Sequence, residues 1–348
     1  FHKSGAHDEI LYKSKPHIGT DVLKNVVADL RNRIIDAGGE VRFNTKLTSL
    51  KIRDGKLVGI VVNDGEEIPA DVVILAIGHS ARDTYEALLN CGVEFKPKPF
   101  SIGVRIEHPQ EIINHAQFGK AAGHAKLGPA DYQLFYRTGD RTVYTFCMCP
   151  GGVVVASASE MESIVTNGMS EFARDKENAN SALVVSVEPQ DFGSSHPLAG
   201  VAFQRNWERL AYKVGGSNNS APVQRLEDFI LGQATTRLGS VRPSYTGKTK
   251  MSDINLCLPS FVTNPMKESI SYFDRKLKGF GMKDALLTGV ETRTSSPVRI
   301  TRGDTLEAIG IKGLYPSGEG AGYAGGIVSA SVDGIRVAEQ IIKTYRQP

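Results

Sequence analysis

The stretch that decides the fold is Gly313–Lys343, with the sequence GLYPSGEGAGYAGGIVSASVDGIRVAEQIIK. A short apolar run precedes a loop that has five glycines within nine residues: Gly318, Gly320, Gly322, Gly325 and Gly326. Apolar residues then recur at helical spacing from Ile327 to Ile342. This order predicts a strand, a glycine loop and a helix, an arrangement in which the free N–H groups at the helix start face an anion, most often a phosphate. A glycine-rich surface turn without a ligand is the alternative, and the loop alone does not identify a ligand.

Composition limits the classes of protein and partner. The 348 residues are 41% apolar and 23% charged, as in an ordinary globular protein, and they suffice for two domains or one large one. No window approaches the roughly 18 uninterrupted apolar residues of a membrane span. A formal charge of +3, without a basic run that contains aromatics, argues against nucleic acid, so we expect small-molecule partners. Four cysteines without a signal peptide predict reduced thiols and a cytoplasmic location.

The first ninety residues predict a helix, a β-meander and a buried strand. The helix is expected over 20–37, with Thr20 as its N-cap and Gly38-Gly39 as its stop. The expected strands are Glu40–Phe43, Leu47–Arg53, Lys56–Val62 and Glu67–Ile68, with Asp-Gly turns between the last three. Asp71–Ile77 is apolar on both faces, as in a parallel sheet, and a helix is expected over 81–89. The opening FHKSGAHDEI lacks the start signal of a domain, which predicts a piece cut from a longer protein.

Beyond Gly92, prolines and short β-type runs predict a separate mixed α+β domain. Its expected strands are 102–106, 133–136, 143–146, 153–158 and 183–187. Its expected helices are 207–214, 225–238 and one helix made of the segments 265–273 and 272–277. Its expected loops are 178–180 and 215–220. Strand patterns return at 291–299 and 305–309. Because the parallel-type strand and the glycine loop belong together, we predict a discontinuous nucleotide-binding domain over 1–91 and 290–348, with a substrate domain inserted at 92–289.

Several motifs together resemble a known family. DVVILAIGHS (71–80), ETRTSSPVRITR (291–302) and the terminal glycine motif resemble the glutathione-reductase-like FAD-dependent dehydrogenases, and most closely a bacterial family of large FAD-dependent dehydrogenases without an assigned function. KPHIGTD (15–21), FCMCPGG (146–152), NGMS (167–170) and PSYTGKT (243–249) are similar to further motifs of that family. The agreement runs from Lys15 to Gln340.

The resemblance implies an α/β fold, α+β overall: an FAD/NAD(P)-binding three-layer Rossmann-like domain with an inserted substrate domain. In such proteins the first strand, a GxGxxG turn and an acidic residue hold the adenine half of FAD, and none of these occurs here. The chain is therefore expected to lack its first βαβ unit. We expect that missing N-terminal segment to be a partner in the complete site.

The resemblance also assigns cofactor-binding residues by position. Gly318 and Glu319 match the glycine–acid pair that meets the pyrophosphate and ribityl part of FAD. Gly325, Gly326 and Ile327 match the helix start whose N–H groups face the O2 edge of the flavin, where a helix dipole stabilises the anionic reduced ring. The remaining cofactor-binding positions that we predict are Gly78, which matches the glycine beside the adenosine half, and Gly320 and Gly322.

A polar run supplies the candidate catalytic residues. Arg293, Thr294, Ser295 and Ser296, with Arg299 and Arg302 nearby, suit an anionic or carbonyl substrate, or the N1–O2 region of the flavin. A charged surface strand is the alternative. Tyr323 in the glycine loop could face the flavin ring or the substrate, or simply pack, and we include it among the catalytic candidates.

The thiols and two histidines are weaker candidates. Alternation along a strand would place Cys147 and Cys149 on one face, where a thiol pair or a soft metal is conceivable. No second Cys or His pair has zinc-ligand spacing, so structural cysteines and no metal are favoured. His17 and His79 flank motif glycines and could act as acid–base groups, although a histidine that caps a turn is commoner.

These observations predict an FAD-dependent oxidoreductase of the dehydrogenase type. It would transfer a hydride or electrons between a small-molecule substrate and the flavin, with NAD(P)H as a possible electron donor. One alternative is a cofactor-free fragment or binding module of such a flavoprotein, since the phosphate-binding fingerprint is absent. A weaker alternative is a tRNA-modifying flavoprotein, against which the near-neutral charge counts.

Overall fold

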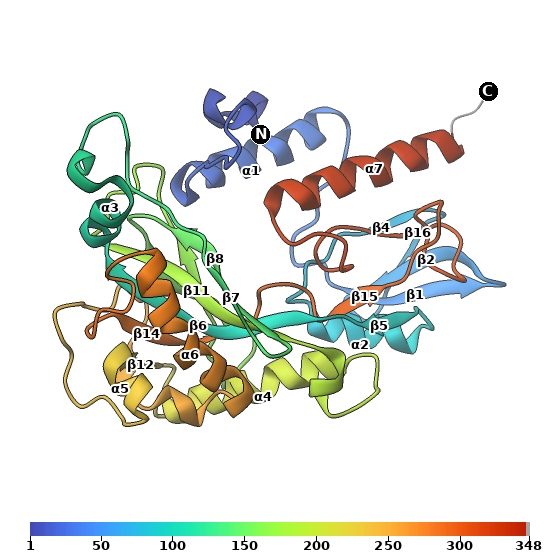
Figure 1. Ribbon diagram of the computed structural model, residues 1–348. Helices are drawn as coiled ribbons and strands as arrows, with labels where there is room; N and C mark the ends of the chain where they lie inside the picture. Colours follow the sequence, from blue (N-terminus) through green and yellow to red (C-terminus); the bar gives the residue numbers. More distant parts are fainter. Residues whose placement is uncertain (346–348) are drawn as a thin grey trace. The chain divides into compact units, whose positions relative to one another are not determined.

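The computed structural model describes residues 1–345 and divides the chain into two compact units (Figure 1). Unit 1 consists of Phe1–Arg42, Ile102–Ser186 and Trp207–Thr292. Unit 2 consists of Phe43–Ser101, Val187–Asn206 and the chain from Arg293 on. The fold as a whole is mixed α/β, as predicted.

Unit 1 is built on a seven-stranded mixed sheet. The strands in spatial order are β13 (Thr249–Met251), β12 (Ala221–Arg225), β14 (Leu286–Glu291), β6 (Phe100–Pro109), β11 (Asn178–Val187), β8 (Arg141–Cys149) and β7 (Phe135–Thr138). β12 and β13 run parallel, whereas the pairs β12–β14, β14–β6, β11–β8 and β8–β7 are antiparallel. The central strands β6 and β11 are buried along almost their whole length, so side chains on both of their faces are enclosed.

Helices and short elements complete unit 1. The helices are α1 (Thr20–Asp36), α3 (Gln110–Phe118), α5 (Leu226–Leu231), α6 (Ser260–Lys276) and α4 (Ala199–Val214), which begins in unit 2. The other elements are the hairpin of β9 (Val153–Ala156) and β10 (Thr166–Met169) and the 3-10 turns η1 (His2–Ser4), η2 (Asp8–Leu11), η3 (Gly119–Ala121) and η5 (Ile254–Leu256). Helix α6 packs against β7 and β8. Its buried side chains include Val262, Met266 and Ile270, which are spaced one helical turn apart.

Unit 2 contains three small sheets and the predicted strand–loop–helix. A meander of β1 (Leu47–Arg53), β2 (Lys56–Val62) and β3 (Glu66–Pro69) is antiparallel; β4 (Val73–Leu75) runs parallel to β16 (Leu314–Pro316); β5 (Phe95–Pro97) is antiparallel to β15 (Val298–Ile300). The remaining elements are α2 (Arg82–Asn90), the 3-10 turn η4 (Pro189–Phe192) and α7 (Ile327–Tyr345). Helix α2 lies along β1 and closes a core that includes Leu57, Leu75, Tyr85 and Leu314 (Figure 1).

Several predicted elements are confirmed. The glycine loop follows strand β16 and precedes helix α7, and the strands 47–53 and 56–62 have the predicted bounds. The strand predicted over 71–77 is shorter than expected, but it does pair in parallel with the strand before the glycine loop. Helix α1 covers the predicted segment, with Gly19 rather than Thr20 as its N-cap.

Other predictions were wrong, each for a physical reason. Glu40–Phe43 is not a strand, because this mostly exposed segment has no pairing partner. Residues 178–180 begin β11 instead of forming a loop, since buried charged groups bond the side chains of Asn178 and Asn180. The helix predicted over 225–238 ends at Leu231, where Gly232 has a left-handed φ of 70°. Residues 305–309 form only an isolated bridge.

The compact units also differ from the predicted domain bounds. Residues 1–42 belong to unit 1, because Thr20 N–H donates to the Ser170 carbonyl (3.1 Å) and Phe172 N–H donates to the Asp21 carboxylate (2.9 Å). The segments 92–101 and 187–206 belong to unit 2, with the glycine loop. The FAD-binding and substrate-binding roles of the two domains stay predictions.

Candidate functional site

The glycine loop of unit 2 is anchored by a carboxylate from the helix that follows it. Asp333 in α7 accepts the Gly318 N–H at 2.8 Å and lies 3.3 Å from the donor hydroxyl of Ser317. Both of its oxygens also accept N–H groups of Arg302, at 2.6 and 3.0 Å. Burial alone would raise the pKa of Asp333, but the bonds from Arg302 and Gly318 outweigh burial and lower it. Asp333 therefore carries a charge that fixes the start of the loop.

A tyrosine connects the two loops that were predicted to meet the cofactor. A Cβ on Gly320 would lie 2.5 Å from the Gly78 carbonyl oxygen, so the two backbones touch and no side chain fits there. The Tyr85 hydroxyl from α2 donates to the Gly320 carbonyl at 2.7 Å and lies 3.3 Å from the Gly78 carbonyl. Burial raises the pKa of Tyr85 to about 12, so the hydroxyl stays a donor. Tyr85 thus holds the predicted site glycines at a fixed separation.

The five glycines of the loop fall into two groups. Gly318 and Gly322 have positive φ (73° and 83°), and Gly320 and Gly322 face backbone at close range, so the fold itself requires these three. Gly325 and Gly326 have no such requirement: a Cβ on Gly325 would meet nothing within 4 Å, and one on Gly326 only the Ser329 hydroxyl at 4.0 Å. They leave open space directly before the first turn of α7.

Exposed apolar side chains and a carboxylate border that space. Ile327 and Val328 in the first turn of α7 are 58% and 54% exposed. Glu319 is partly exposed, and its Oε1 lies 3.0 Å from Nδ1 of the nearly buried His79. The Nδ1 atom is buried and makes no hydrogen bond within the described residues. The arrangement therefore leaves the partly exposed carboxylate of Glu319 available to a bound molecule.

The predicted catalytic residues 293–296 also lie in unit 2, and two of their hydroxyls bond the backbone. Thr294 Oγ1 accepts the Ser101 N–H and donates to the Ser101 carbonyl, at 3.1 and 2.8 Å. Ser296 donates to the Val298 carbonyl at 2.9 Å and is fully buried. These two hydroxyls thus support the backbone, and their catalytic role stays a prediction.

Cations gather around the more exposed members of the run. Arg293 Nη1 donates to the Ser80 hydroxyl at 2.8 Å, and Lys98 Nζ donates to the Ser295 hydroxyl at 3.2 Å. Burial of the Lys98 ammonium, and then the nearby charge of Arg299, lower the pKa of Lys98. Sequence analysis missed Lys98, which lies about 200 residues away from the run along the chain.

Two other candidates have packing partners. The Tyr323 ring is covered by the guanidinium groups of Arg302 and Arg299, which lie 3.7 and 5.1 Å from its centroid, and its hydroxyl accepts the Arg302 N–H at 3.1 Å. His17 belongs to unit 1, where its Nε2 lies 3.0 Å from the Glu171 carbonyl and burial lowers its pKa. Neither contact assigns a catalytic role.

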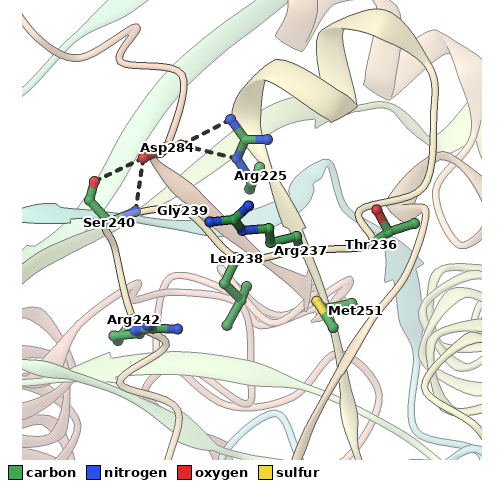
Figure 2. Close-up of a pocket in the computed structure, with 9 residues that line it drawn as sticks. All are labelled: Arg225, Thr236, Arg237, Leu238, Gly239, Ser240, Arg242, Met251 and Asp284. Atoms are coloured by element: carbon green, nitrogen blue, oxygen red, sulfur yellow. Dashed lines mark hydrogen bonds and ion pairs between the residues drawn. The ribbon is translucent and has the colours of Figure 1, made fainter.

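Unit 1 has an open pocket of about 750 Å³ that sequence analysis did not predict (Figure 2). Asp284 accepts from Arg225 at 3.0 Å and from the backbone and hydroxyl of Ser240 at 2.8 and 3.0 Å. Figure 2 shows Arg237 and Arg242 beside this group, and within residues 1–345 neither guanidinium has an ion-pair partner. The pocket therefore carries excess positive charge and suits an anionic group.

Within residues 1–345, His, Cys, Asp and Glu side chains form no group of three that could hold a metal ion. None of the helices in that range combines the length and the apolar character needed to cross a membrane.

Two family models whose descriptions name FAD or flavin match this chain. Residues 99–294, more than half of the chain, match the family model "FAD-dependent protein, C-terminal domain-like", and residues 7–105 match "Flavin containing amine oxidoreductase". A Clostridium beijerinckii relative described as an uncharacterized protein is 55% identical over 99% of this chain, which spans 65% of that relative's length. A phytoene desaturase of Rhodobacter capsulatus is 43% identical over 65 residues, 18% of this chain and 12% of its own length.

Among solved structures, an oxidoreductase from Methanosarcina mazei matches 92% of this chain and 54% of its own, at 12% identity and a TM-score of 0.37. This likeness is too distant to support an argument. The family model that covers more than half of the chain is decisive: this protein belongs to the family described as "FAD-dependent protein, C-terminal domain-like".

Proposed function

We propose that this protein is an FAD-dependent oxidoreductase of the dehydrogenase type, and that the glycine loop of unit 2 holds its flavin. The observation that carries the proposal is the open space at Gly325 and Gly326, where neither a positive φ nor a close backbone contact requires glycine. A bound FAD would supply the redox chemistry, taking up a hydride or an electron pair from a small-molecule substrate. The protein supplies position and charge.

Each part of the loop has a role in this proposal. The N–H groups at the start of the 19-residue helix α7 carry partial positive charge, and Gly325 and Gly326 let a planar ring approach them closely. The partly exposed Glu319 carboxylate is placed to accept hydrogen bonds from ribityl or ribose hydroxyls. Gly318 and Gly320 set the path of the backbone, fixed by Asp333 and Tyr85.

The proposed substrate is a small molecule with an anionic or carbonyl group. In unit 2, Lys98 donates to Ser295, Arg293 donates to Ser80, and the charge of Arg299 acts on Lys98, which favours an anion. The pocket lined by Arg237 and Arg242 in unit 1 also favours an anion. NADH and NADPH are the electron donors to test first, since both carry phosphates. Nucleic acid is not among the proposed partners, given the formal charge of +3.

The test replaces Gly326, which lies directly before α7, and compares the result with the same replacement of Gly334 within α7. Gly326→Val fills the space before α7, whereas Gly334→Val adds the same side chain eight residues later, where a Cβ also meets nothing within 4 Å. We expect purified wild type and Gly334→Val to retain FAD, seen as a flavin absorbance band, and Gly326→Val to lose it at unchanged circular dichroism. Equal FAD retention by both variants would refute the proposed position of the flavin.

The alternative, a cofactor-free binding module, is favoured by one observation. Helix α7 exposes several apolar side chains, among them Ile335 and Ile342 at 60% and 61%, so the unit that carries the loop is uncovered on that side. FAD titration of residues 1–348 and of the longer Clostridium beijerinckii relative distinguishes the two functions. Stoichiometric FAD binding by both proteins supports the oxidoreductase. FAD binding by the relative alone supports the binding module, and FAD binding by neither protein excludes a flavoprotein.

A further inference from the structure

Strand β8 ends in a bulge that separates two thiols which sequence analysis expected on one face. The pairing of β8 with β11 shifts register between Phe146 and Cys149, and Cys147 has a left-handed φ of 45°. As a result Cys147 is exposed, whereas Cys149 is buried at 7% exposure. The Cys149 Sγ donates to the Cys147 carbonyl at 3.3 Å, so the buried thiol lies beneath the exposed residue.

A fully buried cation lies behind this pair. Arg105 Nη1 donates to the Cys147 carbonyl at 2.8 Å and to Asn180 Oδ1 at 3.1 Å. The other nitrogens of Arg105 bond both oxygens of Glu291, at 3.0 and 3.1 Å, so the guanidinium is locked in place. Interaction with the Cys149 thiol, and then the charge of Arg105, lower the pKa of Cys147 to about 5. The pKa of Cys149 is raised, by the same interaction and by burial.

An unsatisfied amide provides an independent sign that this site is built for an anion. Asn180 is the cross-strand partner of Cys149, so their side chains lie on the same face of the sheet. Asn180 is completely buried, its Oδ1 is used by Arg105, and its Nδ2 has no hydrogen-bond partner within the described residues. A buried donor without a partner costs about 1–3 kcal/mol, which the Cys149 sulfur would offset at the moment that it loses its proton.

We propose that Cys147 and Cys149 form a redox-active dithiol, in which Cys147 is the attacking thiol and Cys149 the resolving one. The proposal goes beyond flavin chemistry, and the co-reactant belongs to the class of low-molecular-weight disulfides. The Cys147 thiolate attacks one sulfur of the disulfide RSSR, an RS⁻ leaves, and a mixed disulfide forms on Cys147. Cys149 then loses its proton and attacks the Cys147 sulfur, the second RS⁻ leaves, and the net products are the protein disulfide and two RSH.

The other two cysteines lack this arrangement and serve as internal comparisons. Cys91 is partly buried, and its sulfur contacts the Ser49 hydroxyl and the Leu50 N–H, both at 3.4 Å. Cys257 is completely buried, and burial raises its pKa to about 12. Neither has a second cysteine two residues away. Cys91→Ser is therefore the matched control for the variants Cys147→Ser and Cys149→Ser.

The experiment equilibrates the folded protein with glutathione buffers of stepped redox ratio, followed by acid quench, alkylation and mass spectrometry. In wild type and Cys91→Ser we expect Cys147 and Cys149 to become unreactive toward the alkylating reagent at the same redox ratio. The mass of the segment 146–150 should then fall by two hydrogens. Cys149→Ser should stop at a glutathione adduct on Cys147, and Cys147→Ser should form neither product. The dithiol is excluded if wild type forms no internal disulfide, or if Cys149→Ser forms no adduct.

A second measurement needs no variant and so does not depend on how well a variant folds. Iodoacetamide at pH 6 should alkylate Cys147 in the native protein about tenfold faster than the same thiol in urea-unfolded protein, because a larger thiolate fraction outweighs its lower nucleophilicity. A native rate equal to or below the unfolded rate would overturn the role of Cys147 as the attacking thiol.

Discussion

Replacement of Asp333 by asparagine tests the brace that fixes the glycine loop. The carboxylate pairs with Arg302 through two N–H groups and also holds the Gly318 N–H and the Ser317 hydroxyl. Both charged side chains are close to buried, at 8% exposure for Asp333 and 10% for Arg302. An amide at position 333 would keep one acceptor, but it would point an NH₂ group at donors and leave the Arg302 charge without its counterion.

The structure sets the size of the expected effect. Each lost bond to a charged group is worth about 1.5–3 kcal/mol, and removal of one partner of a buried ion pair costs about 3–5 kcal/mol. Because Arg302 keeps a slight exposure and its bond to the Pro316 carbonyl (2.9 Å), we expect Asp333→Asn to lower the free energy of unfolding of unit 2 by about 3 kcal/mol. Glu339→Gln, on an exposed position of the same helix, should change it by less than about 0.5 kcal/mol.

The assay must report on unit 2. The single tryptophan, Trp207, lies in unit 1, so its fluorescence follows the other unit. Hydrogen exchange of residues 313–333 in a urea series measures the loop directly. The brace would be refuted if Asp333→Asn lowered the free energy of unfolding no more than Glu339→Gln does. It would also be refuted if Asp333→Asn cost as much in a chain that already carries Arg302→Met, where no charge is left unpaired.

Three further predictions concern single groups. Tyr85→Phe should lower the free energy of unfolding by about 1–3 kcal/mol, measured by calorimetry, because the Gly320 carbonyl loses its buried donor. Gly320→Ala should cost about 1–3 kcal/mol by the same method, since its Cβ would press on the Gly78 carbonyl, whereas Gly325→Ala should make the free protein slightly more stable. His108 should make unit 1 less stable in acid: burial lowers its pKa from 6.5 to about 4, so below pH 6.5 the unfolded chain binds a proton that the folded chain excludes, and about 3 kcal/mol is lost by pH 4. The check is urea unfolding followed by Trp207 fluorescence at several pH values. The free energy of unfolding should depend less on pH in His108→Gln than in wild type.

Local signals in the sequence were sufficient for the elements that depend on few neighbours. The hairpin of β1 and β2 has the predicted bounds because Asp54 and Gly55 both take positive φ (51° and 72°), the conformation that a two-residue Asp-Gly turn favours. The parallel pairing of β4 with β16 was predictable because a buried apolar strand and a strand before a glycine loop share a well-known topology. Both inferences need only the residues within each segment.

The groups that sequence analysis missed all act through contacts distant in the chain. Tyr85 meets Gly320 across 235 positions, and Lys98 meets Ser295 across 197. Nothing within nine residues of either side chain indicates such a partner. The same limit applies to β11, where the burial of Asn178 and Asn180 is stabilised by Glu107 and Arg105 from a different strand. Local preference favoured a loop there, and the tertiary bonds reversed it.

The glycine loop shows how a fold requirement can be separated from a ligand requirement without a bound ligand. Glycine gives the unfolded chain extra freedom, so in a loop position with ordinary φ it costs about 0.4–1 kcal/mol relative to alanine, and an unstrained glycine in open space has this cost without a structural reason. A positive φ or a close backbone contact requires glycine at positions 318, 320 and 322, whereas neither applies to Gly325 and Gly326. Gly325 and Gly326 adjoin the amides of α7 and the exposed Ile327. If the flavin is their reason, alanine at Gly325 should make the free protein more stable and the flavin-loaded protein less so, and that opposition of sign is a result that packing alone cannot produce.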